Sequence, residues 1–386
     1  MFPTISDLLH ELLGVNIPLP VQTFGFFVAI SFLGSAYLLA MELKRKEKEG
    51  LLFPLDKKVL VGKPISITEI ISNGLTGFLL GFKLIYAFTN YASFVDDPQG
   101  FILSLEGNWI GGILTAGVFI YLKYREKEKT KLETPVWVEE PMHPYQHVGN
   151  MTLIAAFAGL TGAKIFHNLE NWNTFIADPM GALLSFDGLT MYGGLILASI
   201  SLIIYGRKYK IPTLHLIDSS APSIMIGYAV GRIGCHMSGD GDWGIPSLNP
   251  KPFSWLPDWM WSFDYPHNVV NDGVPIINCT GEKFCNHLVP SVYPTPFYET
   301  IMCLFLFLIL WNIRKKIKTP GVLFSIYLIF NGIERFFIEK IRVNTLYDVN
   351  GFRFTQAELI STILFFLGLV GIFYFRKLEK KKLVGN

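Results

Sequence analysis

Long apolar blocks separated by short charged stretches dominate this 386-residue chain. A helix needs about 20 mostly apolar residues to cross the roughly 30 Å hydrocarbon core of a membrane. Hydrophobic residues make up 51% of the chain and charged residues 17%, against about 25% charged in soluble domains. The pattern predicts an all-α polytopic membrane protein and excludes a disordered chain or a disulfide scaffold. About nine blocks qualify as spans: 21–41, 70–91, 109–124, 151–169, 189–205, 216–234, 296–313, 322–341 and 357–375.

The basic residues between these blocks predict the orientation, because Lys and Arg collect in the cytoplasmic loops of membrane proteins. With the N-terminus outside and the C-terminus inside, nine spans place 24 of the 33 Lys and Arg on the inner side. The outer loops 93–106 and 170–187 contain none. The net charge is only +2 and no basic stripe interleaved with aromatic residues occurs, so we expect no nucleic-acid partner.

An internal repeat divides the chain. The segment that begins at Gly81 aligns with the one that begins at Gly162, so that Lys83 meets Lys164 and the turn after Asp97 meets the turn after Asp178. Both copies are two-helix hairpins in the same orientation, unlike the inverted repeats of many transporters. The expected segments are an outer lead-in (1–20), a first helix with an inner linker (21–64), an extra hairpin with its linker (65–149), a membrane core (150–376) that includes an extracytoplasmic arm (245–292), and a basic cytoplasmic tail (377–386).

Five basic residues lie within the predicted spans or at their ends, where an unpaired charge is costly. Lys340 is placed to extend its charge to the membrane surface. Lys83 and Lys164 lie halfway along their helices, where they either hold helices together through ion pairs or serve a function. The other two, Arg232 and Arg335, have polar neighbours that favour a functional role.

The neighbours of Arg232 and Arg335 indicate an anion site. Residues 231–244 contain five glycines and six polar or ionisable residues, which must line a cavity or pack in protein. Arg335, Glu339 and Arg342 share one helical face, either as a structural Arg–Glu pair or as part of a site. Two arginines near the outer leaflet would clamp a phosphate, and in a membrane that phosphate belongs to a lipid headgroup.

Two further elements are predicted at the outer face. Tyr298 and Glu299 begin the seventh span, and Tyr192 with the pair Gly193 and Gly194 begins the fifth, just after Asp187. Paired glycines let another backbone or a ligand approach closely. A tyrosine at a membrane interface, in contrast, is typically an aromatic anchor.

Together these stretches resemble the prolipoprotein diacylglyceryl transferase family. The family's G-R-x-G-N-F-x-N-x-E-x-x-G run is similar to residues 231–244 with one extra residue, and its G-A-R and H-G-G-L elements are similar to 162–164 and 192–195. Its H-P-S-Q-L-Y-E run is similar to 293–299, and its Y-G-x-x-R-F-x-x-E-x-x-R run to 331–342. The five motifs follow one another in the family's order over roughly residues 150–375.

The resemblance implies an enzyme of the bacterial inner membrane whose active face is extracytoplasmic. Such an enzyme transfers the diacylglyceryl group of phosphatidylglycerol to the lipobox cysteine of a prolipoprotein, the first step of lipoprotein maturation; its partners are these two substrates and the surrounding membrane lipids. We expect Arg232 and Arg335 to hold the phosphate, where charge develops as it departs, and Glu339 to orient Arg335 or to move a proton. The other expected substrate contacts are Lys164, Gly193, Gly194, Gly244, Tyr298 and Glu299.

Departures from the family pattern leave the general base open. Tyr192 stands where the family has histidine, and tyrosine is a poor base at neutral pH because its reference pKa is about 10. The candidates are therefore His236 and Asp240, or the substrate thiol ionises in the field of the arginines. The departures at other positions are Cys235 and Ser238 for asparagine, Asp240 for glutamate, Asn331 for tyrosine, Lys164 for arginine and Phe24 for tyrosine.

The arm 245–292 has no counterpart that we can align. Its segment 252–265 packs three Trp and three other aromatic residues into fourteen positions, so it either guides the substrate peptide at the interface or caps the helices. Cys279 and Cys285 enclose five residues on the oxidising side, which predicts a disulfide, and Cys235 and Cys303 are expected to be free. No spacing of metal ligands occurs, so neither a metal nor another cofactor is expected.

Two other classes of function stay open at this point. Intramembrane Lys and Arg also mark the paths of small-solute transporters, although here they gather at the outer face. The changed histidine and asparagines also fit an inactive relative that binds phosphatidylglycerol or lipoproteins without turnover.

Overall fold

The computed structural model describes residues 1–15, 17, 19, 21–96, 98–184, 190–279, 283–349 and 351–384. The chain separates into two compact units: unit 1 holds Met1–Pro3, Thr23–Leu55 and His143–Asn386, and unit 2 holds Thr4–Gln22 and Asp56–Met142. The fold is mostly helical, as expected for a membrane protein. Within the described residues, five segments are long and apolar enough to cross a membrane: Thr23–Lys48, Ile67–Thr89, Pro144–Glu170, Thr295–Ile313 and Gln356–Lys381.

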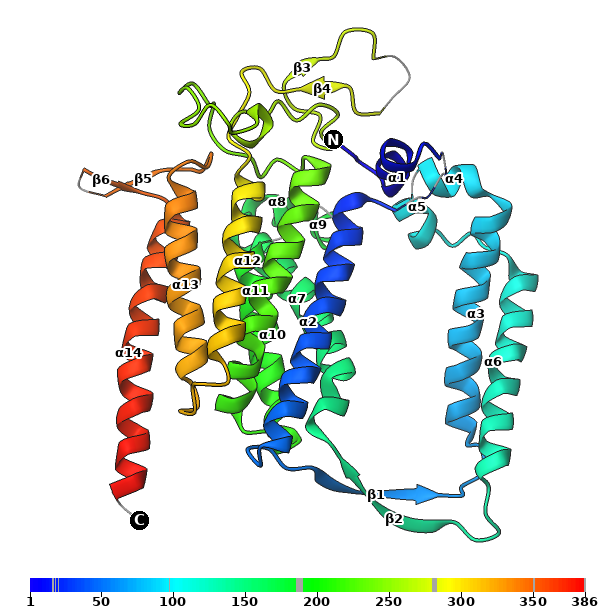
Figure 1. Ribbon diagram of the computed structural model, residues 1–386. Helices are drawn as coiled ribbons and strands as arrows, with labels where there is room; N and C mark the ends of the chain where they lie inside the picture. The colour runs from blue at the N-terminus through cyan, green and yellow to red at the C-terminus, as the bar shows by residue number, and fades with distance from the viewer. Residues whose placement is uncertain are drawn as a thin grey trace. The chain divides into compact units, whose positions relative to one another are not determined.

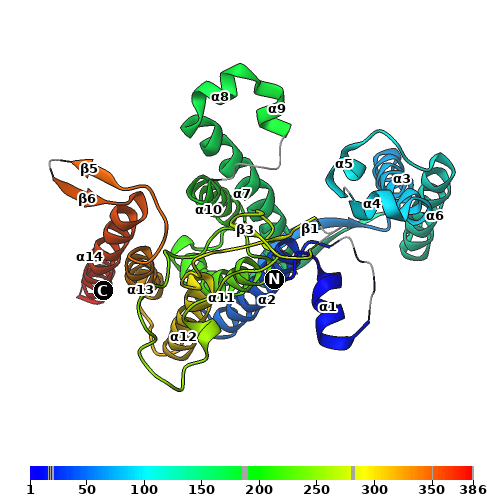
Figure 2. The ribbon, with the colours of Figure 1, turned by 90° about the horizontal axis from the view of Figure 1, so that it is seen from above.

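Unit 1 is a bundle of long helices (Figure 1). α11 packs against α2, α12 and α13, while α7 pairs with α10 and α13 with α14. The view along the helices shows α11 beside α2 and α12 (Figure 2). The long helices of this unit are α2 (Thr23–Lys48), α7 (Val148–Glu170), α10 (Met191–Lys208), α11 (Thr213–Ser238), α12 (Thr295–Ile313), α13 (Val322–Glu339) and α14 (Gln356–Val384).

Small residues let the other helices approach α11. Ala221 and Ala229 are small and completely buried, and with the equally buried Met225 between them on the same face they form one cluster with Cys303 and Leu310 of α12. Small side chains on one helical face let neighbouring helices approach closely. This packing matters in a membrane, because lipid is as apolar as the helix surface and the hydrophobic effect does not drive helices together there. The core of unit 1 therefore centres on α11.

Short elements join the long helices of unit 1. η1 precedes α7, two short helices connect α7 to α10, and η2 and a hairpin belong to the segment between α11 and α12. A second hairpin lies between α13 and α14. Their bounds are η1 (Pro144–His147), α8 (Trp172–Ala177), α9 (Pro179–Leu184), η2 (Asp258–Met260), β3 (Val274–Pro275), β4 (Asn286–His287), β5 (Tyr347–Val349) and β6 (Phe352–Phe354).

Unit 2 consists of an amphipathic helix, a helical hairpin and a two-stranded sheet. The strands β1 and β2 come from the two charged linkers that the sequence places on the inner side, and they pair with each other. The expectation of an all-α protein is therefore too strict, because three two-stranded sheets occur in the described residues. The elements of this unit are α1 (Ile5–Leu13), β1 (Leu55–Val61), α3 (Ile67–Thr89), α4 (Tyr91–Asp96), α5 (Pro98–Leu103), α6 (Trp109–Thr130) and β2 (Val136–Met142).

The two hairpins have the same internal order of a long, two short and a long helix: α3 to α6 in unit 2, and α7 to α10 in unit 1. In each of them glycines meet where the long helices are closest. A Cβ added to Gly81 would lie 2.6 Å from the carbonyl oxygen of Gly111, and one added to Gly193 would lie 2.5 Å from that of Gly162. The aligned glycines therefore serve the same close helix contact in both copies.

Replacing Gly162 with alanine should destabilise the α7–α10 hairpin. The new Cβ would meet the Gly193 carbonyl and would lie 2.7 Å from Cβ of Leu197, so the helices must separate. We expect the free energy of unfolding to fall by about 1–3 kcal/mol, measured by denaturant titration in detergent. Gly149→Ala on the same helix is the control, because nothing lies within 4 Å of its added Cβ. Equal stabilities of the two variants would contradict the packing argument.

Three helix ends differ from the sequence expectation. α11 continues to Ser238 rather than ending near 234, and Gly239, with φ 66°, ends it in a left-handed cap. α14 continues past the predicted span end at 375 to Val384, so the basic end of the chain, which we expected to be solvated, is helical. α10 begins at Met191, while the expected start at Leu189 and the preceding Asp187 lie outside the described residues, as does Asp97 in the first copy.

Candidate active site

The end of α11, the start of α12 and the end of α13 meet in unit 1, joined by the glycine-rich loop 239–244. The hydroxyl of Thr295 donates to the carbonyl of Asp242 (2.8 Å). The amide of Gly244 donates to the carbonyl of Tyr293 (2.9 Å), and the amide of Ile245 donates to that of Ile341 (2.8 Å). These bonds hold the loop against both neighbouring helix ends.

Glu299 of α12 gathers three arginines around one carboxylate. Its Oε2 pairs with Nε of Arg232, and its Oε1 lies 3.2 Å from Nη1 of Arg335 and 3.2 Å from Nη1 of Arg342. The Glu299 side chain is 0% exposed. A buried carboxylate needs such partners, because desolvation of an unpaired charge costs several kcal/mol.

Two more carboxylates complete this arginine–carboxylate network. Asp242 bridges Nη1 of Arg232 and Nη2 of Arg342, the latter at 2.5 Å. Glu339 pairs with Nη2 of Arg335 at 3.1 Å, which supports the expected orienting contact. The structure thus brings together Arg232 and Arg335, which were expected to hold the phosphate, with Glu339 and Glu299. In this geometry Glu299 is a shared counter-charge, and its expected contact with substrate stays a prediction.

Tyr192 belongs to the same site. Its hydroxyl, near the start of α10, interacts electrostatically with Arg335, Glu339 and Arg342. The motif that the family resemblance aligned with a histidine therefore lies near these charged residues.

Asp240 lies next to Asp242 and Cys235. Ligand atoms of Cys235 and Asp240 lie within 4.8 Å of each other, and Nη1 of Arg232 donates to Sγ of Cys235 at 3.7 Å. Burial and the neighbouring Asp242 carboxylate raise the pKa of Asp240. Burial would also raise the pKa of Asp242, but the guanidiniums of Arg232 and Arg342 outweigh it and lower that pKa.

Cys235, Asp240 and Asp242 also carry atoms of the kind that bind cations. One ligand atom each from Cys235, Asp240 and Asp242 lies within 4.8 Å of the others. However, Arg232 donates to both Cys235 and Asp242, so its positive charge competes with a cation for these two side chains. The adjacent guanidinium therefore disfavours a metal ion at this position.

His236 faces the arm rather than the arginines. Its Nδ1 is 3.1 Å from the hydroxyl of Tyr265, and its ring packs against Phe263, Tyr265 and Phe297. Of the two candidate bases, the structure thus places Asp240 beside the network, whereas His236 contacts aromatic rings.

Backbone packing accounts for the glycines expected at the site. Gly193 contacts Gly162, a Cβ on Gly194 would lie 2.9 Å from the carbonyl of Gly159, and one on Gly244 would lie 2.5 Å from that of Ile341. From the sequence, either another backbone or a ligand was expected to approach the paired glycines closely. In the structure it is the backbone of α7 that approaches them. A substrate contact at any of the three stays a prediction.

The lysines of the two hairpins are engaged in interactions. Lys83 donates from Nζ to the carbonyls of Phe101 (2.8 Å), Ser104 (2.5 Å) and Glu106 (2.8 Å). It therefore caps a backbone segment and forms no ion pair within the described residues. Lys164 holds the equivalent position on α7 and also has an interaction partner.

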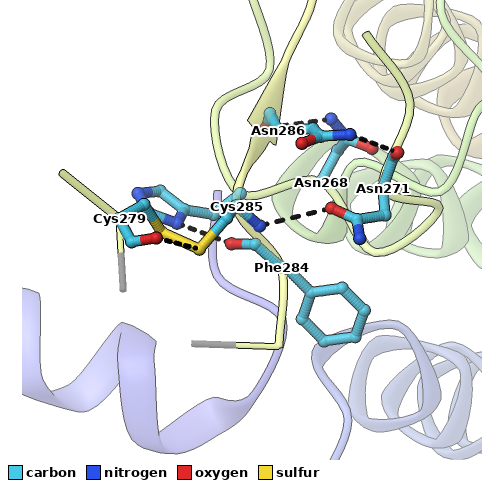
Figure 3. Close-up of a disulfide and its surroundings, with 7 residues drawn as sticks. Asn268, Asn271, Cys279, Phe284, Cys285 and Asn286 are labelled. Atoms are coloured by element: carbon cyan, nitrogen blue, oxygen red, sulfur yellow. Dashed lines mark hydrogen bonds between the residues drawn. A yellow bond between two sulfur atoms is a disulfide. The ribbon is translucent and has the colours of Figure 1, made fainter. Parts of the chain in front are cut away.

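The arm packs on the helix ends and is closed by a disulfide. Cys279 and Cys285 are bridged, as predicted (Figure 3), and Cys235 and Cys303 are free. Asn271 accepts from the Cys285 amide at 3.2 Å. The other contacts that fix the arm are Asn286 to Asn271 (2.7 Å), Asn268 to Tyr265 (3.1 Å) and Tyr298 to Met260 (2.7 Å).

Three side chains of the site were not predicted from the sequence. Asp242 follows Asp240 by two residues, and the one-residue insertion in this motif hid which of them faces Arg232. Glu334, beside Arg335 in sequence, is buried, and its carboxyl oxygens have no hydrogen-bond partner in the described structure. Tyr228 lies one turn before Arg232, whose guanidinium carbon is 5.2 Å from its ring centroid. The four-residue spacing between Tyr228 and Arg232 was the only sequence feature that pointed to Tyr228 as a neighbour of this arginine.

Fold and site together define a helical membrane protein with a buried arginine–carboxylate network at one end of its bundle. A family model described as prolipoprotein diacylglyceryl transferase matches residues 102–374, and the chain belongs to this family. The matched range begins in α5, so it includes α6 of the hairpin that we treat as extra, whereas α2 and α3 precede it.

Similar proteins carry the same family name. A phosphatidylglycerol–prolipoprotein diacylglyceryl transferase of Dehalococcoides mccartyi is 28% identical over 292 residues, covering 74% of this chain and 96% of its own. The enzyme of that name from Lysinibacillus sphaericus is 28% identical over 270 residues, 69% of this chain and 88% of its own. That from Leptospira interrogans is 27% identical over 330 residues, 71% and 89% of the two chains.

Proposed function

We propose that this protein transfers the diacylglyceryl group of phosphatidylglycerol to the lipobox cysteine of prolipoproteins, the first step of bacterial lipoprotein maturation. The names of its relatives state the lipid and the prolipoprotein. The observation that carries the proposal is the convergence of Arg232, Arg335 and Arg342 at one buried site. An anionic phosphodiester at leaflet depth needs such a cluster of guanidiniums.

The reaction is a displacement at one carbon of the acylated glycerol, the carbon that is bonded to the phosphate oxygen. The cysteine sulfur uses a lone pair to form a carbon–sulfur bond, and the carbon–oxygen bond to the phosphate breaks. Glycerol phosphate leaves with that electron pair and gains one negative charge. The thiol gives up its proton, because the thiolate is the nucleophile. Donors aimed at the departing phosphate lower the barrier, since charge develops there.

Each residue of the site has a role in this scheme. Arg232 and Arg335 hold the phosphate, and Glu339 orients Arg335 through their 3.1 Å pair. Tyr192 takes part through its electrostatic interaction with Arg335. We assign the thiol proton to Asp240, because a carboxyl with a raised pKa is a better base near neutral pH than an ordinary one.

The membrane arrangement belongs to the proposal as well. Nine helices of 18 residues or more in the described chain coincide with the nine apolar blocks of the sequence. Nine crossings with the N-terminus outside place the arginine network on the extracytoplasmic side of the bacterial inner membrane, where prolipoprotein substrates emerge. In this arrangement the arm lies at the outer interface, and its exposed Phe253, Trp255 and Trp259 can meet lipid or peptide.

Complementation of a bacterium depleted of its own transferase tests the proposal. We expect the chain to restore growth and the formation of diacylglyceryl-modified lipoproteins. Failure to complement, with the protein present in the membrane and still binding phosphatidylglycerol, would indicate an inactive relative.

A further inference from the structure

The arginine–carboxylate network is electrically balanced without substrate. Three guanidiniums (Arg232, Arg335 and Arg342) face three paired carboxylates (Asp242, Glu299 and Glu339). A phosphodiester brings one more negative charge into this network. The arginines can pair fully with this phosphodiester only if one of the three carboxylates gives up its contacts with them.

Asp242 is the carboxylate that can leave. The side chains of Glu299 and Glu339 are 0% exposed and sit on α12 and α13, whereas the Asp242 side chain is 36% exposed. Asp242 lies on a loop between Gly241, with φ 96°, and Gly244. Its backbone is fixed by the Thr295 hydroxyl, so its side chain can rotate out while the loop stays in place.

The Asp242 carboxylate makes the kind of contact that arginines make with a phosphate. One of its oxygens pairs with Arg232 and the other with Arg342, so it bridges two guanidiniums from different segments. The two free oxygens of a phosphodiester make the same bridging contact, since guanidinium forks bind carboxylate and phosphate alike. Asp242 therefore occupies the anion position between Arg232 and Arg342.

We infer that Asp242 is an internal substitute for the lipid phosphate: it holds the site between Arg232 and Arg342 and is displaced when phosphatidylglycerol binds. This inference rests on the proposed function for the identity of the anion. It adds Arg342 to the phosphate site and makes Asp242 a residue that weakens lipid and product binding. Release of glycerol phosphate is then assisted by the returning carboxylate.

Asp242→Asn tests this inference, because it removes the competing charge and keeps the shape. We expect the KM for phosphatidylglycerol in detergent micelles and the Kd of glycerol phosphate, from thermal shifts, both to fall at least threefold. kcat should fall as well, since product leaves more slowly. Asp242→Glu keeps the charge and should bind neither ligand more tightly than the wild type. Asp348→Asn removes an exposed acid of the β5–β6 hairpin outside the network and should change neither constant.

Weaker or unchanged binding in Asp242→Asn would overturn the inference and make Asp242 a structural partner of the arginines. If the Asn variant cannot be purified in folded form, Asp242→Ser carries the same expectation. Failure of both neutral variants to fold would also overturn it, because the site then cannot release this carboxylate. The Kd of glycerol phosphate is measured without turnover, so a wild type that binds glycerol phosphate but transfers nothing refutes only the proposed function.

Discussion

Arg335→Gln is expected to lower diacylglyceryl transfer at least 100-fold in a protein that still folds. Removing one charged donor from a developing anion typically costs a factor of about 10²–10³. Arg335 is also the most exposed arginine of the network, at 19%, and without it Glu299 still pairs with Arg232 and Arg342. The measurement is the rate of mass gain of a lipobox peptide with purified enzyme and phosphatidylglycerol.

Lys340→Gln is the matched control for this substitution. Lys340 follows α13 directly, carries the same charge and pairs with Glu358 at 2.5 Å, outside the network. We expect this variant to keep activity within about twofold of wild type. Activity of Arg335→Gln near that of Lys340→Gln would remove Arg335 from the phosphate site.

Glu299→Ala is expected to have the largest effect on stability. It leaves three guanidiniums facing one another around a cavity, and breaking a buried ion pair on one side costs about 3–5 kcal/mol. Because Arg232 would lose its Nε partner, transfer should be lost too. Denaturant titration in detergent measures the first effect and the peptide assay the second.

Glu334→Gln serves as the control for Glu299, since it changes another buried glutamate of the same site. Its carboxyl oxygens have no hydrogen-bond partner in the described structure, so no arginine loses a contact when it becomes neutral. We expect stability equal to or above that of wild type, because glutamine keeps the size of the side chain and a neutral group costs less to bury than a carboxylate without partners. Similar losses of stability in both variants would contradict the role of Glu299 as the shared counter-charge.

The long helices were predictable because each of them corresponds to one continuous run of apolar residues in the sequence. Each of the nine apolar blocks overlaps a helix of at least 18 residues in the described chain. The ends were less predictable: α11 runs on to Ser238 because the left-handed cap falls at Gly239, although Gly231 and Gly234 precede it. Several glycines competed for the same role, and packing against α2 and α12 decides among them.

Contacts between distant segments could not be derived from the sequence. The pairing of β1 with β2 joins two linkers on either side of a hairpin, and neither strand has a local signal for its partner. The arginines were found because charge inside a span is conspicuous. Asp242 was missed because loop residues carry no such signal, and only the folded loop shows which of the aspartates bridges Arg232 and Arg342.

The most direct test of the account is transfer by the purified protein in detergent, supplied with phosphatidylglycerol and a lipobox peptide. The account predicts that the peptide cysteine gains one diacylglyceryl group in a thioether bond, that one glycerol phosphate is released for each modified peptide, and that a peptide with serine in place of the cysteine is not modified. A folded protein that binds phosphatidylglycerol and leaves the cysteine peptide unmodified would contradict it.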